Sequence, residues 1–222
     1  MKKIIVSGAI LLSLSGCGTV NNALTEKTKT VEYYRIFDIK TDADREVVAE
    51  SASDGLGKNV SDINEERPIP MSAELPSKPG RFALINPLEG SKFAALASGN
   101  SQLSFKIATC KGASWIANGT RSITGQSELK LTACLFQYSE GYHLDLYATF
   151  TKQEGGLMEL SRKAASAMVG TPEEWTEKTF LDVVREISAD TNANITYLEG
   201  YPKLEGTPWL DSGDSIAGAN TN

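Results

Sequence analysis

Two consecutive segments near the middle of the chain alternate between apolar and polar side chains, and they constrain the fold more than any other feature of the sequence. Residues 129–136 place leucine or alanine at every second position, and residues 144–150 resume the alternation after a short polar stretch. A period of two is typical of a β-strand with one buried face, and two such runs around a glycine-containing turn predict a hairpin. With a two-residue turn at Glu140-Gly141, Leu131 faces Phe150, Ala133 faces Ala148 and Leu135 faces Leu146. We therefore expect an antiparallel hairpin whose apolar face belongs to the core.

The opposite face of this hairpin combines aromatic side chains with one acid and the only histidine of the chain. Its members are Phe136, Tyr138, His143, Asp145 and Tyr147. Such a group is able to line a shallow binding surface. Antiparallel sheets also commonly have one face partly solvated or covered by a loop, and aromatic cross-strand pairs stabilise such a face without any ligand. Both interpretations stay open, a possible binding face and a structural one.

The segments around the hairpin predict further strands and three helices. Residues 31–39 are rich in β-branched and aromatic side chains, as expected for a strand, and residues 41–57 carry apolar side chains four apart, which indicates a helix. The apolar spacing of residues 157–168 predicts a second helix. Residues 171–189 begin with a threonine cap, a proline and two acids, which is a strong start signal for a third helix. A final strand is expected at 195–198.

Residues 58–80 form a connection with a distinct composition. They hold Pro68, Pro70, Pro76 and Pro79, half of the eight prolines in the chain. Each proline removes a backbone donor and restricts the residue before it, so we expect little regular structure there. This segment is either a plain loop strapped over the surface or a proline-rich ligand for a partner.

Two cysteines in the strand-rich region predict a disulfide. Cys110 and Cys134 both fall on the polar parity of their expected strands, so they point to the same side if those strands are neighbours. Closing a loop of this length stabilises a fold by ~3 kcal/mol in the chain-entropy model. A catalytic thiol is the alternative, but no histidine lies near either cysteine in the sequence. A metal site has even less support, because the chain has no CxxC motif and a single histidine.

The N-terminus has the parts of an export signal. Lys2 and Lys3 precede an uncharged, mostly apolar run that ends at Leu14, and this run is too short to cross a bilayer as a helix, which needs ~20 residues. The sequence Leu14-Ser15-Gly16-Cys17 then resembles the lipobox of bacterial lipoproteins. The resemblance covers only residues 1–17, and it implies that Cys17 carries a diacylglycerol and becomes the new N-terminus. An ordinary signal with an incidental cysteine, or a buried N-terminal helix, are the alternatives.

These observations predict the α+β class: a single globular domain with an antiparallel sheet and helices packed on one face, behind a flexible lipid-anchored tether. The expected layout is a cleaved signal at 1–16, the lipidated cysteine and tether at 17–30, the domain at 31–205 and a polar tail at 206–222. Within the domain we expect a strand-helix unit at 31–57, the proline-rich connection at 58–80, antiparallel strands at 81–151, and two helices with a final strand at 155–200.

Charge and missing motifs narrow the functional classes. The formal charge of −6 becomes about −8 once Lys2 and Lys3 leave with the signal, which argues against nucleic acid and against docking on anionic lipid. Membrane association is then expected through the lipid alone. Gly18, rather than an aspartate, follows the lipidated cysteine, and this favours the outer membrane with the domain in the periplasm.

No catalytic constellation, metal or cofactor motif is apparent. We expect a non-catalytic module that binds another envelope protein, with a carrier or enzyme for a cell-wall or lipid-like ligand as the alternative.

Overall fold

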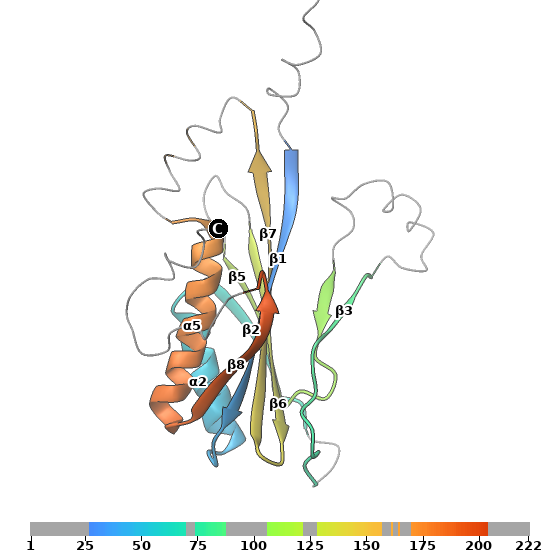
Figure 1. Ribbon diagram of the computed structural model, residues 1–222, viewed down its shortest axis with the longest axis vertical. Helices are drawn as coiled ribbons and strands as arrows, with labels where there is room; N and C mark the ends of the chain where they lie inside the picture. Colours follow the sequence, from blue (N-terminus) through green and yellow to red (C-terminus); the bar gives the residue numbers. More distant parts are fainter. Residues whose placement is uncertain are drawn as a thin grey trace, which may run out of the picture.

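The computed structural model describes residues 27–69, 74–87, 106–121, 128–156 and 170–203, together with Ser161 and Ala164. Its centre is a six-stranded antiparallel sheet in the order β2-β5-β6-β7-β1-β8, and a second sheet pairs β3 with β4 (Figure 1). The strands are β1 (Lys27–Lys40), β2 (Asp62–Glu66), β3 (Ala83–Ile85), β4 (Ile107–Thr109), β5 (Trp115–Arg121), β6 (Leu129–Tyr138), β7 (Gly141–Glu154) and β8 (Asn194–Tyr201). The helices are α2 (Arg45–Gly57) and α5 (Pro172–Thr191). The α+β prediction is confirmed.

The hairpin predicted from the alternation is the pair β6 and β7, with a different register. Tyr138 pairs with Gly141, so the two turn residues are Ser139 and Glu140. The observed pairs are Leu131 with Ala148, Ala133 with Leu146 and Leu135 with Leu144. The predicted register was therefore wrong by two residues. Because side chains alternate with a period of two, this shift leaves the same residues on the same faces, and hydrophobic pattern alone does not separate the two registers.

The strand β1 lies between β7 and β8 and begins earlier than predicted. It starts at Lys27, four residues before the expected boundary at residue 31, because its pairing with β7 continues from Ile39 to Lys27. The segment 27–30 is therefore part of the sheet rather than of the tether. Lysine and threonine alternate there, so the strand is extended by its backbone partner rather than by burial of apolar side chains.

One strand, β2, was missed by the sequence prediction. The strand β2 lies inside the proline-rich segment, where no strand was expected, and pairs with β5, which falls in the predicted strand region 81–151 but was not located individually. The sequence of β2, DINEE, is acidic and four of its five residues are exposed. Strand propensity is low for such residues, so this edge strand exists because β5 offers it a backbone partner.

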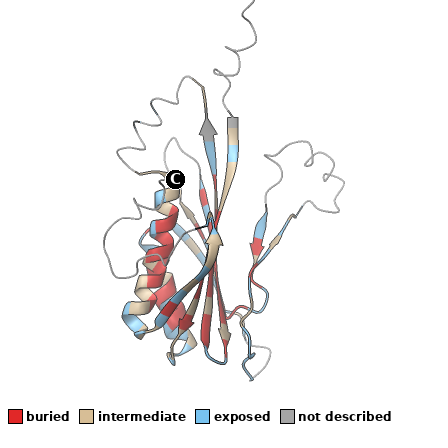
Figure 2. Cartoon of the chain, in the orientation of Figure 1, coloured by how far each residue is buried: buried red, intermediate tan, exposed pale blue. Residues whose placement is uncertain are grey.

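Both helices pack on one face of the sheet and form the main core. Figure 2 shows buried residues on the sides of the helices that face the strands and along the central strands. Leu56 of α2 and Val183 and Ile187 of α5 meet Leu135 and Leu146 of the hairpin in this core. The helices also approach one another closely, since a Cβ added at Gly55 would lie 2.4 Å from the Cα of Val183. Only glycine allows this contact without a shift of the backbone.

The predicted cap of α5 is confirmed in detail. Thr171 Oγ1 accepts a hydrogen bond from the backbone N–H of Glu174 at 3.2 Å, and the Glu174 carboxylate accepts one from the Thr171 N–H at 2.8 Å. The predicted helix at 157–168, the polar tail at 206–222 and the lipidation site at Cys17 lie outside the described residues. Among the helices that the structure describes, none is long and apolar enough to cross a membrane.

Candidate functional site

The five side chains of the possible binding face lie on the side of the sheet opposite the helices, and a covering segment contacts Phe136, Asp145 and Tyr147 among them. We call residues 80–85 and 106–113, which contain β3 and β4, the strap; in Figure 1 β3 lies across the sheet from α2 and α5. Phe136, Tyr138, Asp145 and Tyr147 are buried, and the side chain of His143 is 16% exposed. Phe136 and Tyr147 belong to a second, smaller core with Phe82 and Ala108 of the strap, and Asp145 contacts the strap through the Phe82 N–H.

The strap is attached to the sheet by a covalent and a polar contact. The predicted disulfide between Cys110 and Cys134 is confirmed, with 5.6 Å between the two Cα atoms. The backbone N–H of Phe82 donates a hydrogen bond to Asp145 Oδ2 at 2.8 Å. Asp145 itself pairs across the hairpin with Cys134. Both attachments therefore reach the same point of the sheet.

Apolar contacts also hold the strap against the sheet. The ring of Phe82 lies 5.6 Å from that of Tyr34 and 5.8 Å from that of Tyr147. Gly80 lies against the ring of Phe136, where an added Cβ would come within 2.5 Å of a ring carbon. The two ring pairs are tilted, with interplanar angles of 60° and 36°, and both lie within the roughly 4.5–7 Å range of favourable aromatic contacts. The strap is thus matched in shape to the aromatic face that it covers.

The polar groups beneath the strap have perturbed acidities. Burial raises the pKa of Asp145 to about 6, and the Phe82 N–H and the Arg81 charge oppose that shift. Burial lowers the pKa of His143. Asp145 Oδ1 and His143 Nδ1 are 3.8 Å apart, and within the described part of the chain neither atom has a hydrogen-bond partner. Two buried titratable groups with one unused atom each are uncommon in a purely structural core.

A polar network joins this face to the hairpin turn. The Tyr138 hydroxyl donates to Asp38 Oδ1 at 2.6 Å, and Lys40 Nζ donates to that hydroxyl and, at 2.6 Å, to Glu140 Oε2. The bond to Glu140 is the main cause of the raised pKa of Lys40, and burial is the main cause of the raised pKa of Tyr138. Glu140 is largely exposed, so the ion pair at the turn contributes little to stability.

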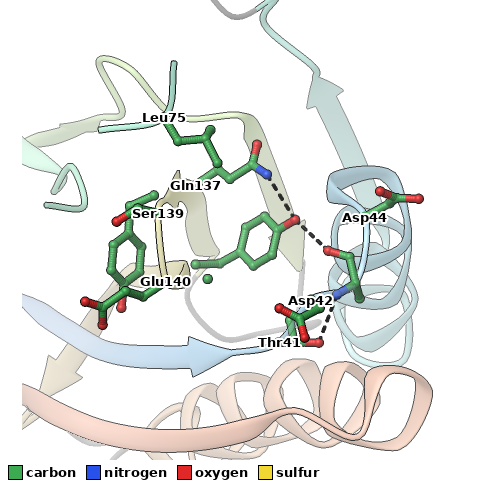
Figure 3. Close-up of a pocket in the computed structure, with 11 residues that line it drawn as sticks. Thr41, Asp42, Asp44, Leu75, Gln137, Ser139 and Glu140 are labelled. Atoms are coloured by element: carbon green, nitrogen blue, oxygen red, sulfur yellow. Dashed lines mark hydrogen bonds between the residues drawn. The ribbon is translucent and has the colours of Figure 1, made fainter. Parts of the chain in front are cut away.

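A pocket of about 230 Å³ opens between the hairpin turn and the start of α2. Figure 3 shows Thr41 and Asp42 on one side of the pocket and Gln137 on the other, with the Asp44 side chain at the start of α2 pointing away from Gln137. Tyr142 lines the same pocket, and its hydroxyl donates to the Ala43 carbonyl at 2.8 Å and accepts from Gln137 Nε2 at 3.3 Å. The full lining is Thr41, Asp42, Ala43, Asp44, Leu75, Gln137, Tyr138, Ser139, Glu140, Gly141 and Tyr142. Its small volume and polar lining differ from the larger, mostly apolar pockets that hold most small ligands.

A buried ion pair on the helix side was not foreseen from the sequence. Arg35 of β1 and Glu177 of α5 are both buried, and Arg35 Nε donates to Glu177 Oε2 at 3.2 Å while a second guanidinium nitrogen binds the other carboxylate oxygen. Arg35 also donates to the carbonyls of Tyr34 and Pro202, at 2.8 and 2.9 Å. The two residues are 142 positions apart, so no local sequence pattern predicts the pair. It ties β1 to α5 and to the end of β8.

The two edges of the sheet differ in character. The edge strand β2 carries the acids Asp62, Glu65 and Glu66. The other edge strand, β8, exposes Leu198 at 48% and Tyr201 at 57%. Charged side chains on an edge discourage pairing with another chain, whereas an edge with exposed apolar side chains remains available for contacts.

The described residues contain no group of three or more histidine, cysteine, aspartate or glutamate side chains that could hold a metal ion. Cys110 of the strap and Cys134 of β6 are joined to each other, so neither is a free thiol. The described residues thus form a covered aromatic face, a small polar pocket and a sheet edge with two exposed apolar side chains. No protein-family model matches this sequence, and a comparison with curated proteins found no match either.

Proposed function

We propose that the protein is a bacterial lipoprotein of the outer membrane, anchored through diacylglycerol on Cys17, whose periplasmic domain binds another envelope protein without catalysis. The anchor is supported by the lipobox-like sequence Leu14-Ser15-Gly16-Cys17 and the basic, apolar segment before it. The acidic charge of the domain supports an anchor made by lipid alone, because an acidic protein gains nothing from anionic headgroups.

The main support for a binding role is that both faces of the sheet are covered whereas one edge exposes apolar side chains. The helices cover one face and the strap covers the other, so both aromatic and aliphatic clusters of the described chain are packed as cores. At the edge, β8 presents Leu198 and Tyr201 to solvent. Apolar side chains along a strand with one unpaired edge are suited to contact with a protein partner. The partner-binding surface in this proposal is β8.

The position of β8 suits a partner at a distance from the membrane. The tether joins the domain at Lys27, and β1 then extends for about 45 Å, at about 3.3 Å per residue, to Lys40. The strand β8 pairs with the part of β1 between Tyr34 and Lys40, which is the half farther from the anchor. A partner on β8 would therefore meet the domain in the periplasmic space rather than at the lipid surface.

A carrier or enzyme for a lipid-like or cell-wall ligand has less structural support. A carrier needs an enclosed apolar cavity, whereas the described pocket is polar and about 230 Å³, smaller than the roughly 300 Å³ at the lower end of ligand sites. An enzyme needs a group that can reach a substrate, and Tyr138, Asp145 and Tyr147 of the hairpin face are buried, while the His143 side chain is only 16% exposed.

Site-specific photo-crosslinking in intact cells of the native host tests the binding role. A photoreactive residue in place of Leu198 or Tyr201 should give adducts with one defined envelope protein. The same residue in place of Asp62 or Glu66, exposed on the opposite edge, is the matched control and should not. Equal adducts from both edges, or none from β8, would argue against this surface. Complete loss of function from one polar substitution on the hairpin face, with normal folding and sorting, would instead favour catalysis.

A further inference from the structure

Two buried polar atoms face each other beneath the strap. Asp145 uses Oδ2 to accept the Phe82 N–H at 2.8 Å, so this carboxyl group holds the strap directly. Its other oxygen, Oδ1, lies 3.8 Å from His143 Nδ1, and among the described residues neither atom has a hydrogen-bond partner. An ionised carboxylate and a neutral imidazole with its hydrogen on Nε2 would present two acceptors to each other. Leaving both unsatisfied in a buried site is costly.

One hydrogen between the two atoms would satisfy both. A protonated carboxyl donates through Oδ1, and the unprotonated Nδ1 of the imidazole accepts. This hydrogen bond requires the two atoms to approach from 3.8 Å to hydrogen-bond distance. There are two alternatives: a carboxylate that accepts from an imidazole with its hydrogen on Nδ1, and an imidazolium beside a carboxylate. Both keep the carboxylate ionised in a place where the Asp145 side chain is fully buried, which is costly. In such a site the desolvation of two ions offsets much of their attraction, so the neutral pair is favoured.

The charged groups around Asp145 and His143 do not change the preference for the neutral carboxyl-imidazole pair. The groups nearest the pair are Asp38 and Lys40 on β1, Tyr138 on β6, Arg81 on the strap and Glu199 on β8. Two of these are cationic and two are anionic, and Arg81 and Glu199 form an ion pair with each other. Their effects largely cancel, so burial is the main influence on the pair, as the raised pKa of Asp145 and the lowered pKa of His143 both indicate.

We propose that Asp145 takes up a proton from solvent at mildly acidic pH while the strap is closed, and that its Oδ1–H donates to His143 Nδ1. The strap is then seated on a neutral carboxyl-imidazole pair, with Oδ2 still accepting the Phe82 N–H. When the strap opens, both groups meet water, and the proton moves from Asp145 to His143 because the imidazole is the stronger base in water. The pair holds one proton in either state.

This proton exchange makes the equilibrium between the closed and open strap insensitive to pH over a range in which Asp145 or His143 alone would make it pH-dependent. The raised pKa of Asp145, about 6, means that falling pH favours closure between about 6 and the ordinary value near 4. The lowered pKa of His143 has the opposite sign, because an open strap lets the imidazole protonate below about 6.5. At pH 5 both states hold one proton, so the two effects offset each other in the wild-type protein.

Nitrogen NMR of the full-length chain in detergent micelles tests where the proton resides. His143 is the only histidine, so its ring resonances need no assignment by mutagenesis. We expect a neutral ring with unprotonated Nδ1 at pH 5, and a one-proton step near pH 6 in the Phe82 amide, whose acceptor is Asp145. A ring that becomes an imidazolium at or above its ordinary pKa would overturn the proposal. A Phe82 amide that shows no step would overturn it as well.

Two substitutions separate the opposing effects through hydrogen exchange of the Phe82 amide, corrected for its intrinsic pH dependence. Asp145→Asn keeps an acceptor for Phe82 and places an N–H towards His143, so exchange should accelerate as pH falls below about 6.5, by up to about tenfold per pH unit. His143→Gln leaves Asp145 alone, so exchange should accelerate as pH rises from about 4 to about 6, also by up to about tenfold per unit. The exposed Asp54→Asn on α2 is the charge-matched control and should match the wild type.

Slopes of the same sign in the two variants, or a wild-type slope as steep as either, would contradict the shared proton. If Asp145→Asn does not fold, the His143→Gln profile and the wild-type ring resonances still decide the question. These measurements do not involve β8 or a partner, so their outcome is independent of the proposed binding role.

Discussion

At the scale of single residues, the buried pair of Arg35 and Glu177 shows how much one long-range contact can matter. Burial raises the pKa of Glu177, and the Arg35 guanidinium opposes that rise. The arginine also satisfies the carbonyls of Tyr34 and Pro202. Removing one partner of such a pair leaves an uncompensated buried charge, which costs far more than the pair contributes when intact.

We expect Arg35→Met to lower the free energy of unfolding by about 3 to 5 kcal/mol at pH 7. With the guanidinium gone, the raised pKa of Glu177 makes this loss largest at neutral pH, and the loss should shrink as pH falls and the carboxylate is protonated. Arg35→Met combined with Glu177→Leu should recover most of it. Urea denaturation at pH 5 and 7 measures these values, with Arg45→Met, from the more exposed pair with Glu46, as a control expected to change little. A loss that grows towards acid would contradict the argument.

Gly80 offers a second test at this scale, because its missing side chain makes room for the ring of Phe136. Gly80→Ala should displace the strap or the ring and cost about 1 to 3 kcal/mol, as overpacking does. Gly57→Ala is the matched control, since nothing lies within 4 Å of a Cβ at that position and alanine favours the helix. Thermal unfolding of the two variants should therefore differ clearly. Equal melting temperatures would mean that the strap adapts without strain.

At the scale of elements, the β6–β7 hairpin is where the sequence was most informative. Alternation correctly assigned which side chains share a face, because a period of two admits only two choices. It could not decide between the turns Ser139-Glu140 and Glu140-Gly141. The observed turn leaves Gly141, with a φ of 138°, as the first residue of β7, where a Cβ would lie 2.2 Å from the Ile39 carbonyl oxygen. That contact comes from β1, so only the neighbouring strand reveals the constraint.

The buried face of the hairpin should dominate its stability. Leu135→Ala and Leu146→Ala each remove a side chain with no exposed surface, and each should lower the free energy of unfolding by about 2 to 5 kcal/mol. Lys130→Ala, on the exposed parity of the same strand, should change it by less than about 0.5 kcal/mol. Chemical denaturation measures all three. A small effect of both leucine substitutions would mean that the core relaxes around the cavity.

At the scale of the whole molecule, the domain combines a long central sheet, helices on one face and a strap on the other. Arg35 links β1 to α5, and the disulfide between Cys110 and Cys134 links the strap to β6. The proposed lipid would join this body to the membrane at the start of β1. The anchor and the folded domain are thus separate features of the chain, and each can be tested without disturbing the other.

We expect Cys17→Ser to abolish lipid attachment and to leave the precursor uncleaved or released from the membrane, while the domain remains folded. Metabolic labelling with an acyl analogue, followed by membrane fractionation, checks the first part. Recovery of the Cys110–Cys134 disulfide in the variant checks that export and folding are intact. Labelling that persists after the substitution would rule out Cys17 as the acylated residue.

The sequence by itself determined the features that depend on local periodicity and local chemistry. The faces of the hairpin, the capped start of α5 at Thr171 and the α+β class all follow from patterns within a few residues. Parity also indicated that Cys110 and Cys134 point to the same side. Tertiary structure alone decided the strand β2, whose acidic residues form a strand only because β5 is beside them, and the pairing of Arg35 with Glu177 across 142 positions. It also decided that the aromatic hairpin face is covered, because the strap that covers it comes from another part of the chain. Contacts between distant segments are set by packing and topology, which leave no periodic signal in either segment.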